Sequence, residues 1–208
     1  MNTDQNPWDA EYRHRGRLWG GGVPSCPRQQ LSSRILELGC GDGKTVSSLA
    51  QSGWFITAID SSPCAASLCR KTCPDPDQVV VLIADSRRIP FRNESFDRVC
   101  ASHITGHLSP DGRCQLAGEV MRILTPGGTL SFRDFSTEDF RCGRGRETEM
   151  GTFIRKNGIT THYFTGDELV TLFAGFTVQS LVHHRWEIRV RGSTLPRAEI
   201  VAEFKKPA

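Results

Sequence analysis

The sequence predicts an α/β fold, namely a doubly wound sheet of about seven strands, mostly parallel, with a final antiparallel hairpin. Between residues 35 and 135, short apolar segments alternate with helix-like segments. The apolar segments lack a polar face, which is typical of parallel strands covered on both sides. Near the C-terminus, two strand-like segments follow each other across a short turn, as antiparallel neighbours do. The first apolar segment runs directly into Gly39, Gly41 and Gly43.

Each expected element has a local signal. The helix after the glycines places Val46, Leu49 and Ala50 on one face, and the next helix begins with a serine cap and Pro63 in its first turn. A Pro-Gly-Gly turn at 126–128 precedes the fifth strand. The expected strands are 35–39, 54–60, 79–85, 96–103, 129–135, 178–191 and 198–204. The expected helices are 43–53, 61–73, 109–124 and 166–176.

We expect a single folded domain over residues 31–208, because no internal repeat or low-complexity tract divides the chain. A length of 208 residues is enough for one well-buried core. Residues 1–30 form a polar, Gly-rich leader, and residues 136–164 form an insertion between the fifth strand and the last helix.

The composition favours a soluble, cytoplasmic protein without membrane partners. The N-terminus lacks the basic-then-apolar pattern of a signal peptide, and no apolar run is long enough to span a bilayer. The eight cysteines are scattered, which indicates reduced, packed thiols, not a disulfide framework or a metal site. The net charge is +3, and residues 141–156 carry five basic against two acidic side chains. Either a nucleic-acid surface or a solvated loop would show such a basic run.

Three kinds of glycine loop compete for residues 35–43, ILELGCGDG. A phosphate-binding P-loop requires glycine where the chain has Leu38, and a dinucleotide loop requires glycine where it has Lys44. The remaining pattern, E-x-G-x-G-x-G, resembles motif I of the class I S-adenosylmethionine (AdoMet) methyltransferases, whose sheet is Rossmann-like. The resemblance implies that Glu37 shapes the loop and that AdoMet is the cofactor, with S-adenosyl-L-homocysteine as product and no metal. The loop residues expected against the amino acid part of AdoMet are Gly39, Cys40, Gly41 and Gly43.

Ligands of doubly wound sheets bind at the carboxyl ends of the strands, and the second and third strands end in carboxylates. Asp60, followed by Ser61, stands 23 residues after Glu37, where it can accept both ribose hydroxyls; the alternative is a helix N-cap. Asp85 and Ser86 end the third strand, where the resemblance places the contact with the adenine amino group. The alternative for Asp85 is a turn-forming role.

The fourth strand ends at Ser102 and His103, beside the expected position of the sulfonium and methyl group. His103 is a candidate base, a candidate substrate contact or a capping residue. The leader contains aromatic residues, among them Trp19, which either close over the cofactor as a lid or pack at the edge of the domain.

The second half resembles the eukaryotic methyltransferase-like enzymes that make 3-methylcytidine in tRNA. The similar segments are RDF at 133–135, FIRKNGITTHYFT at 153–165, and the Asp-Glu-Leu of the last helix. The resemblance implies that Arg133 and Asp134 line the acceptor side of the pocket. It also implies that Phe135, Arg155 and Tyr163 lie on the substrate side, although those enzymes have tyrosine where this chain has Phe135.

The acceptor remains open between a tRNA-like RNA and a small metabolite. N3 of cytosine has a free lone pair near neutral pH, so it needs orientation more than a base, and Asp134 could hydrogen-bond the exocyclic amine. An oxygen or thiol acceptor would require a base, for which His103 is the candidate. A third alternative is a non-catalytic AdoMet-binding subunit that stabilises a partner protein. The intact glycine loop and Asp60 argue against it.

Overall fold

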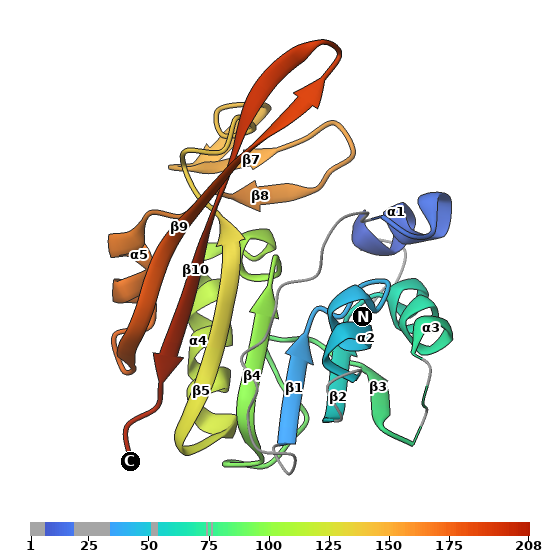
Figure 1. Ribbon diagram of the computed structural model, residues 1–208, viewed down its shortest axis with the longest axis vertical. Coiled ribbons are helices and arrows are strands. Elements are labelled where there is room, and N and C mark those ends of the chain that lie inside the picture. The colour runs from blue at the N-terminus through green and yellow to red at the C-terminus, as the bar shows by residue number, and fades with distance from the viewer. Residues whose placement is uncertain (1–6, 19–33, 51–53, 74, 76) are drawn as a thin grey trace.

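A computed structural model of the chain describes residues 7–18, 34–50, 54–73, 75 and 77–208 (Figure 1). Its centre is a sheet of seven strands in the order β3-β2-β1-β4-β5-β10-β9. The pairs formed among strands β1 to β5 are all parallel, whereas β10 runs antiparallel to both β5 and β9. The predicted fold, mostly parallel with a final antiparallel hairpin, is therefore confirmed. The strands are β1 (Arg34–Leu38), β2 (Phe55–Asp60), β3 (Val79–Ile83), β4 (Phe96–Ser102), β5 (Leu124–Phe135), β9 (Thr177–Val190) and β10 (Ser193–Lys205).

The helices begin where the sequence offers a cap. The side chains of Ser62, Ser109 and Thr165 accept hydrogen bonds from backbone N–H groups in the first turns of α3, α4 and α5. A proline follows each of the two serines at the first helical position, where its missing N–H costs nothing. The α-helices are α1 (Pro7–Arg15), α2 (Lys44–Ala50), α3 (Pro63–Thr72), α4 (Pro110–Ile123) and α5 (Gly166–Leu172), and a 3-10 turn, η2, spans Thr105–His107.

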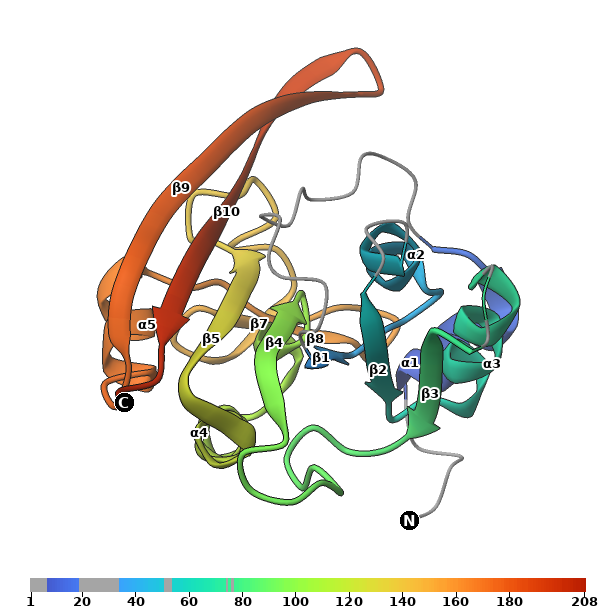
Figure 2. The same ribbon diagram turned by 60° about the horizontal axis from the view of Figure 1, so that its bottom comes forward.

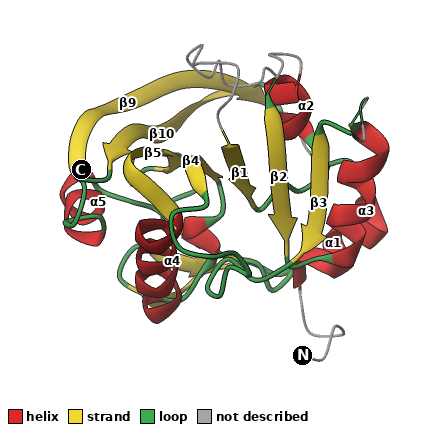
Figure 3. Cartoon of the chain, turned by 90° about the horizontal axis from the view of Figure 1, so that it is seen from below, coloured by secondary structure: helices red, strands yellow, loops and turns green. Residues whose placement is uncertain are grey.

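Two layers of helices bury the two faces of the sheet (Figure 3). On one face, α4 and α5 pack through Leu116, Val120 and Leu169 against β4, β5 and β10. On the other face, α2 and α3 pack through Val46 and Cys69 against β1, β2 and β3. Successive residues of a strand point to opposite faces, so both faces of the central strands are apolar, as expected of a doubly wound sheet.

The insertion folds as a small second sheet at the carboxyl edge of the main sheet (Figure 1). Its strands are β6 (Arg146–Glu149), β7 (Thr152–Ile154) and β8 (Thr160–His162), in antiparallel order β6-β7-β8. A core of Phe135, Phe153 and Tyr163 joins this sheet to the end of β5.

Three details differ from the expectations. Helix α1 lies inside the leader, where the sequence predicted no element. Strand β5 begins at Leu124, so the expected turn at 126–128 is a bend within the strand, with Gly127 at φ +73° and a register shift against β4. Strand β10 includes Pro196, because the β9–β10 hairpin continues well beyond the rest of the sheet. Among the described helices, none is long and apolar enough to cross a membrane.

Candidate active site

The glycine loop turns sharply at the end of β1, and neighbouring groups pack closely against its backbone. Gly39, Gly41 and Gly43 have φ of +67°, +54° and +86°, a region that side chains disfavour. A Cβ at Gly41 would lie 2.5 Å from the hydroxyl of Tyr12, and one at Gly39 would lie 2.9 Å from Cδ1 of Ile104. Glycine is thus required here by conformation and by space. Such a loop, at the carboxyl end of a strand and before a helix, fits a ligand that approaches the main chain closely.

Asp60 ends β2 and fixes this loop. Its Oδ2 accepts a hydrogen bond from the Gly41 N–H at 2.9 Å, and its Oδ1 accepts one from the Ser62 N–H at 2.8 Å. Burial raises the pKa of Asp60 above its ordinary value, partly offset by these two hydrogen bonds. Ser62 is the N-cap of α3, so the carboxylate of Asp60 supports the helix start without being the cap itself. Its predicted contact with the ribose remains a prediction, as does that of the exposed Ser61.

Cys40 and Glu37 complete the base of the loop, and both are buried. A hydrogen bond with Cys69 raises the pKa of the Cys40 thiol, so this thiol is a neutral packing group at neutral pH. The described cysteines, Cys40, Cys64, Cys69, Cys73, Cys100, Cys114 and Cys142, are all free thiols.

Helix α1 covers the loop from the leader. Asp9, which is 2% exposed, accepts hydrogen bonds from the Ser62 hydroxyl at 2.6 Å and from the Cys64 N–H at 3.0 Å. These bonds dock α1 onto the start of α3 and bring Tyr12 against Gly41. Part of the leader therefore packs against the glycine loop. Trp19, the leader residue expected to contact the cofactor, lies outside the described residues.

The third strand contributes less directly. Both carboxylate oxygens of Asp85 accept hydrogen bonds from the Arg87 side chain, the shortest at 2.6 Å, and Oδ1 also accepts the Arg87 N–H. The hydrogen bond with the Arg87 guanidinium holds the pKa of Asp85 below its ordinary value. Asp85 thus forms a turn, the alternative that the sequence left open, while the neighbouring Ser86 is buried. Contact of either residue with adenine remains a prediction.

The acceptor end is built around His103, directly after β4. Its φ is +54°, and its N–H donates to the Arg133 carbonyl at 2.8 Å. The imidazole lies between two buried carboxylates: Nδ1 is 3.7 Å from Asp134 Oδ1, and Nε2 is 3.4 Å from Glu199 Oε2. Burial works to lower the pKa of His103, but the interactions with Asp134 and Glu199 outweigh it, so the pKa is raised. The side chain is still 33% exposed and can reach a ligand.

Asp134 and Arg133 hold this arrangement together. Asp134 is fully buried, and its oxygens accept the N–H groups of Gly106 at 2.8 Å and Phe135 at 2.9 Å. Arg133 donates to Glu199 Oε1 at 2.8 Å. Both residues were predicted to line the acceptor side. The structure brings them to His103, where their side chains bind protein groups.

The aromatic residues expected on the substrate side are buried. The Phe135 ring stacks on His103, with 4.3 Å between centroids, and the Arg141 guanidinium lies 3.8 Å from its centroid. Tyr163 is 1% exposed, and its hydroxyl accepts a hydrogen bond from Arg155 at 3.2 Å. In this structure Phe135, Tyr163 and Arg155 therefore support the floor of the site. Direct stacking of a substrate on them remains a prediction.

No sequence motif indicated Glu199 or Asp9, whereas Tyr12 is one of the leader aromatics expected near the cofactor loop or at the edge of the domain. Glu199 is the second carboxylate beside His103, yet it lies 96 positions away and on a strand with no motif. Its position follows from the strand order, because β10 pairs with β5 and sets Glu199 opposite Phe135. Asp9 and Tyr12 lie in a helix that buries few side chains, so no apolar period marks it.

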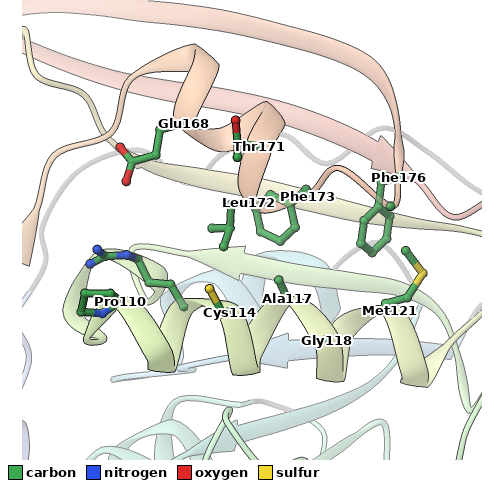
Figure 4. Close-up of a pocket in the computed structure, with 12 residues that line it drawn as sticks. Pro110, Cys114, Ala117, Gly118, Met121, Glu168, Thr171, Leu172, Phe173 and Phe176 are labelled. Carbon is green, nitrogen blue, oxygen red and sulfur yellow. The ribbon is translucent and has the colours of Figure 1, made fainter.

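A separate groove of about 600 Å³ lies between α4 and α5 (Figure 4). Ala117, Leu172 and Phe176 line its apolar part, Glu168 lies at one end, and Arg113 also lines the groove. It is formed where two helices meet over one face of the sheet, and neither the glycine loop nor His103 lines it. The candidate site is therefore the carboxyl edge, where the loop, Asp60 and His103 converge.

The residues at this edge fit AdoMet. The glycine loop, of which Gly39 is partly exposed, can receive its amino acid part, and the partly exposed Asp60 lies at the end of the next strand. No group of three or more His, Cys, Asp or Glu side chains in the described residues is arranged to hold a metal ion.

Comparisons with known proteins agree with this geometry. Residues 35–128 match the model of a methyltransferase domain. The tRNA N(3)-cytidine methyltransferase METTL2 of Gallus gallus is 30% identical over 198 residues, which cover 88% of this chain and 54% of that protein. The chain thus spans about half the length of the curated relatives it matches.

Solved structures show the same fold. A SAM-dependent methyltransferase of Methanosarcina mazei superposes with a TM-score of 0.71 at 24% identity, covering 86% of this chain and 94% of that one. The N-methyltransferase NodS of Bradyrhizobium japonicum, solved with S-adenosyl-L-homocysteine, gives a TM-score of 0.63 at 20% identity, covering 85% and 79%. Residues 35–128 of the chain thus match a methyltransferase domain, and the chain shares the fold of solved SAM-dependent methyltransferases.

Proposed function

We propose that this chain is an AdoMet-dependent methyltransferase whose acceptor is RNA, namely N3 of a cytidine in a tRNA-like substrate. The observation that carries the proposal is the extent of the similarity to the tRNA N(3)-cytidine methyltransferases. It covers 198 residues and therefore includes the acceptor half as well as the cofactor half. The geometry supports it, because His103, Asp134 and Glu199 form a charged cluster at the acceptor end.

The roles of the residues follow from their contacts. When bound, AdoMet supplies a methyl group activated by its sulfonium, so the protein must mainly position the acceptor. Asp60 and the glycine loop hold the cofactor side. Asp134 is a positioning residue, because it binds the backbone of Gly106 and faces His103. His103, raised in pKa and partly exposed, donates a hydrogen bond to the acceptor ring.

A contact between Asp134 and the exocyclic amine of the cytosine, proposed from sequence, would have to reach a carboxylate that is 0% exposed and already accepts two backbone hydrogen bonds. Glu199 lies beside the same imidazole and is 3% exposed. We therefore propose that these carboxylates orient His103 and favour its protonated form, and that His103 donates to the O2 carbonyl oxygen of the cytosine, which leaves the N3 lone pair free. N3 of cytosine is nucleophilic without a base, so a protonated histidine does not hinder the reaction.

Labelled-methyl transfer tests the proposal. Purified chain is incubated with labelled AdoMet and total RNA or, separately, a small-molecule extract, and the RNA is digested to nucleosides. We expect label in 3-methylcytidine, and His103→Gln should lower the rate about 10- to 100-fold while AdoMet affinity is unchanged. Label found only in small molecules would show that the acceptor is a small molecule and not RNA. AdoMet binding without transfer to either pool would favour a non-catalytic subunit that needs a partner protein.

A further inference from the structure

The last two strands extend past the sheet as an arm over its carboxyl edge (Figure 2). Strand β10 pairs with β5 from Glu199 to Lys205, and the hairpin beyond that point pairs only with itself. We call residues 185–198 the arm. The loop after β5 supports its base, because the N–H groups of Ser136 and Phe140 donate to the Ala198 and Pro196 carbonyls at 3.1 and 3.0 Å.

A row of stacked groups connects the arm with the acceptor end. The His103 ring stacks on Phe135, and the Arg197 guanidinium lies 5.0 Å from the Phe135 centroid. The same guanidinium lies 5.2 Å from the Trp186 centroid, and Trp186 stacks on His184 at 5.1 Å. Arg197 is fixed in turn by a 2.7 Å hydrogen bond to the buried Asp139. The arm is therefore held in a defined position relative to His103.

The arm carries a concentrated positive charge. It contains Arg185, Arg189, Arg191 and Arg197 against the single acid Glu187, a surplus of three, which equals the net charge of the whole chain. Arg189 and Arg191 are exposed near the tip, whereas Arg185 pairs with Glu138 and Arg197 is partly buried. Two exposed guanidinium groups therefore project from the outer part of the arm.

Protection of an edge strand does not explain this distribution. Strand β9 is the edge of the sheet, and exposed edges are commonly guarded by charges along their length. Yet residues 177–184, the part of β9 that borders the sheet proper, contain no Lys, Arg, Asp or Glu, and Val182 there is 57% exposed. The charges begin only where the hairpin leaves the sheet, which points to a polyanionic ligand above the carboxyl edge.

The basic segment at 141–156 is a second positively charged surface, separate in sequence from the arm. Arg141 donates to Asp139 and lies over Phe135, and Arg155 binds the Tyr163 hydroxyl. Arg144 lies over the Phe140 ring at 4.8 Å. Of the five basic side chains, Arg141 is paired with a carboxylate, whereas Arg144, Arg146, Arg155 and Lys156 are exposed and keep their positive charge at the surface.

We propose that the arm is an RNA-binding surface in which Arg189 and Arg191 contact backbone phosphates while the target nucleotide lies at His103. The inference rests on the proposed RNA methyltransferase function. From the Glu199–His184 pair to the tip, the hairpin rises by six residue pairs, or about 20 Å at about 3.3 Å per residue. In B-DNA the phosphates of one strand are spaced about 3.4 Å along the helix axis, and on that scale an arm of about 20 Å extends over several nucleotides from the target.

The test compares R189Q/R191Q with the control K71Q/R92Q, which removes the same charge from exposed residues elsewhere. Binding of both variants and wild type to a tRNA is measured over a series of salt concentrations. For R189Q/R191Q we expect affinity at low salt to fall about tenfold or more, and the slope of log K against log salt to decrease by about two. The control and the charge-preserving R189K/R191K should keep the wild-type slope.

A length series isolates the distance argument. Methyl transfer to a trinucleotide that contains the target cytidine should be equal in wild type and R189Q/R191Q, because the arm lies beyond its ends. With full-length tRNA, the variant should need a several-fold higher RNA concentration than wild type to reach the same rate of methyl transfer.

Failure of the arm and failure of the function give different results. If tRNA is methylated and R189Q/R191Q matches the control in slope and affinity, the arm is not the RNA surface, and an acidic protein partner becomes the alternative. If the wild-type protein binds AdoMet yet methylates neither the trinucleotide nor full-length tRNA, the proposed function fails. AdoMet affinity and thermal unfolding establish that each variant is folded. If R189Q/R191Q is not folded, the single variant R191Q is used in its place.

Discussion

At the scale of single residues, His103 is the position where the structure adds most to what the sequence indicated. The sequence placed it at the end of the fourth strand and left its role open between base, contact and cap. The structure adds two buried carboxylates, one from β5 and one from β10, 3.4 to 3.7 Å from its ring nitrogens. Only tertiary structure could reveal this, because Glu199 belongs to a strand that the fold inserts beside β5.

The same cluster predicts a pH dependence of stability. Burial lowers the pKa of His103, but Asp134 and Glu199 raise it, and the net result is an increase above 6.5. The imidazolium therefore stabilises the folded state. This contribution is complete below 6.5 and is lost as pH rises through the folded-state pKa. The free energy of unfolding, measured in urea from about pH 5.5 to 8.5, should therefore fall more steeply for wild type than for His103→Gln. The difference in slope is at most about 1.4 kcal/mol per pH unit. The exposed control His14→Gln should follow wild type; identical profiles for wild type and His103→Gln would contradict the assignment.

At the scale of elements, the sequence predicted the sheet strands and the helices α2 to α5 because each has a cap, a glycine end or an apolar period. It missed α1, whose buried residues are only Asp9 and Tyr12. It also placed the start of β5 five residues late, because Pro126, Gly127 and Gly128 indicate a turn wherever they occur. Elements held by polar contacts or by pairing with a distant strand leave no periodic signal in the sequence.

Helix α1 should depend on one buried carboxylate. Asp9→Ala removes the acceptor of the Ser62 hydroxyl and the Cys64 N–H, at a cost of about 1–3 kcal/mol to the docking of the helix. Because α1 brings Tyr12 against the glycine loop, AdoMet affinity should fall and proteolytic cleavage within residues 7–18 should accelerate. Arg13→Ala is the matched control, since Arg13 binds the same carboxylate from a side chain that is 65% exposed. Equal cleavage rates for the two variants would show that Asp9 does not anchor α1.

At the scale of the whole molecule, the two halves of the site belong to different parts of the sheet. The glycine loop and Asp60 lie at the ends of β1 and β2, which the sequence predicts from local motifs. His103, Asp134 and Glu199 come from β4, β5 and β10, where strand order brings them together. The residues of the proposed cofactor side follow from local sequence motifs, whereas those of the proposed acceptor side are brought together only by the fold. This division implies that ligand binding and acceptor chemistry can be separated by mutation.

Thermal unfolding with AdoMet measures that separation. A ligand at about 100 times its Kd stabilises a protein by about 2.7 kcal/mol, which for a chain of this size raises Tm by about 5–11 °C. Asp60→Asn places an amide where the carboxylate accepts the Gly41 and Ser62 N–H groups, so one of these bonds is lost together with the proposed ribose contact. We expect this variant to lose most of the AdoMet-induced shift. His103→Gln should retain it, because His103 lies at the acceptor end. The Tm of each protein without AdoMet is recorded as the reference. If Asp60→Asn shows the full AdoMet-induced rise in Tm, Asp60 is not part of the cofactor site.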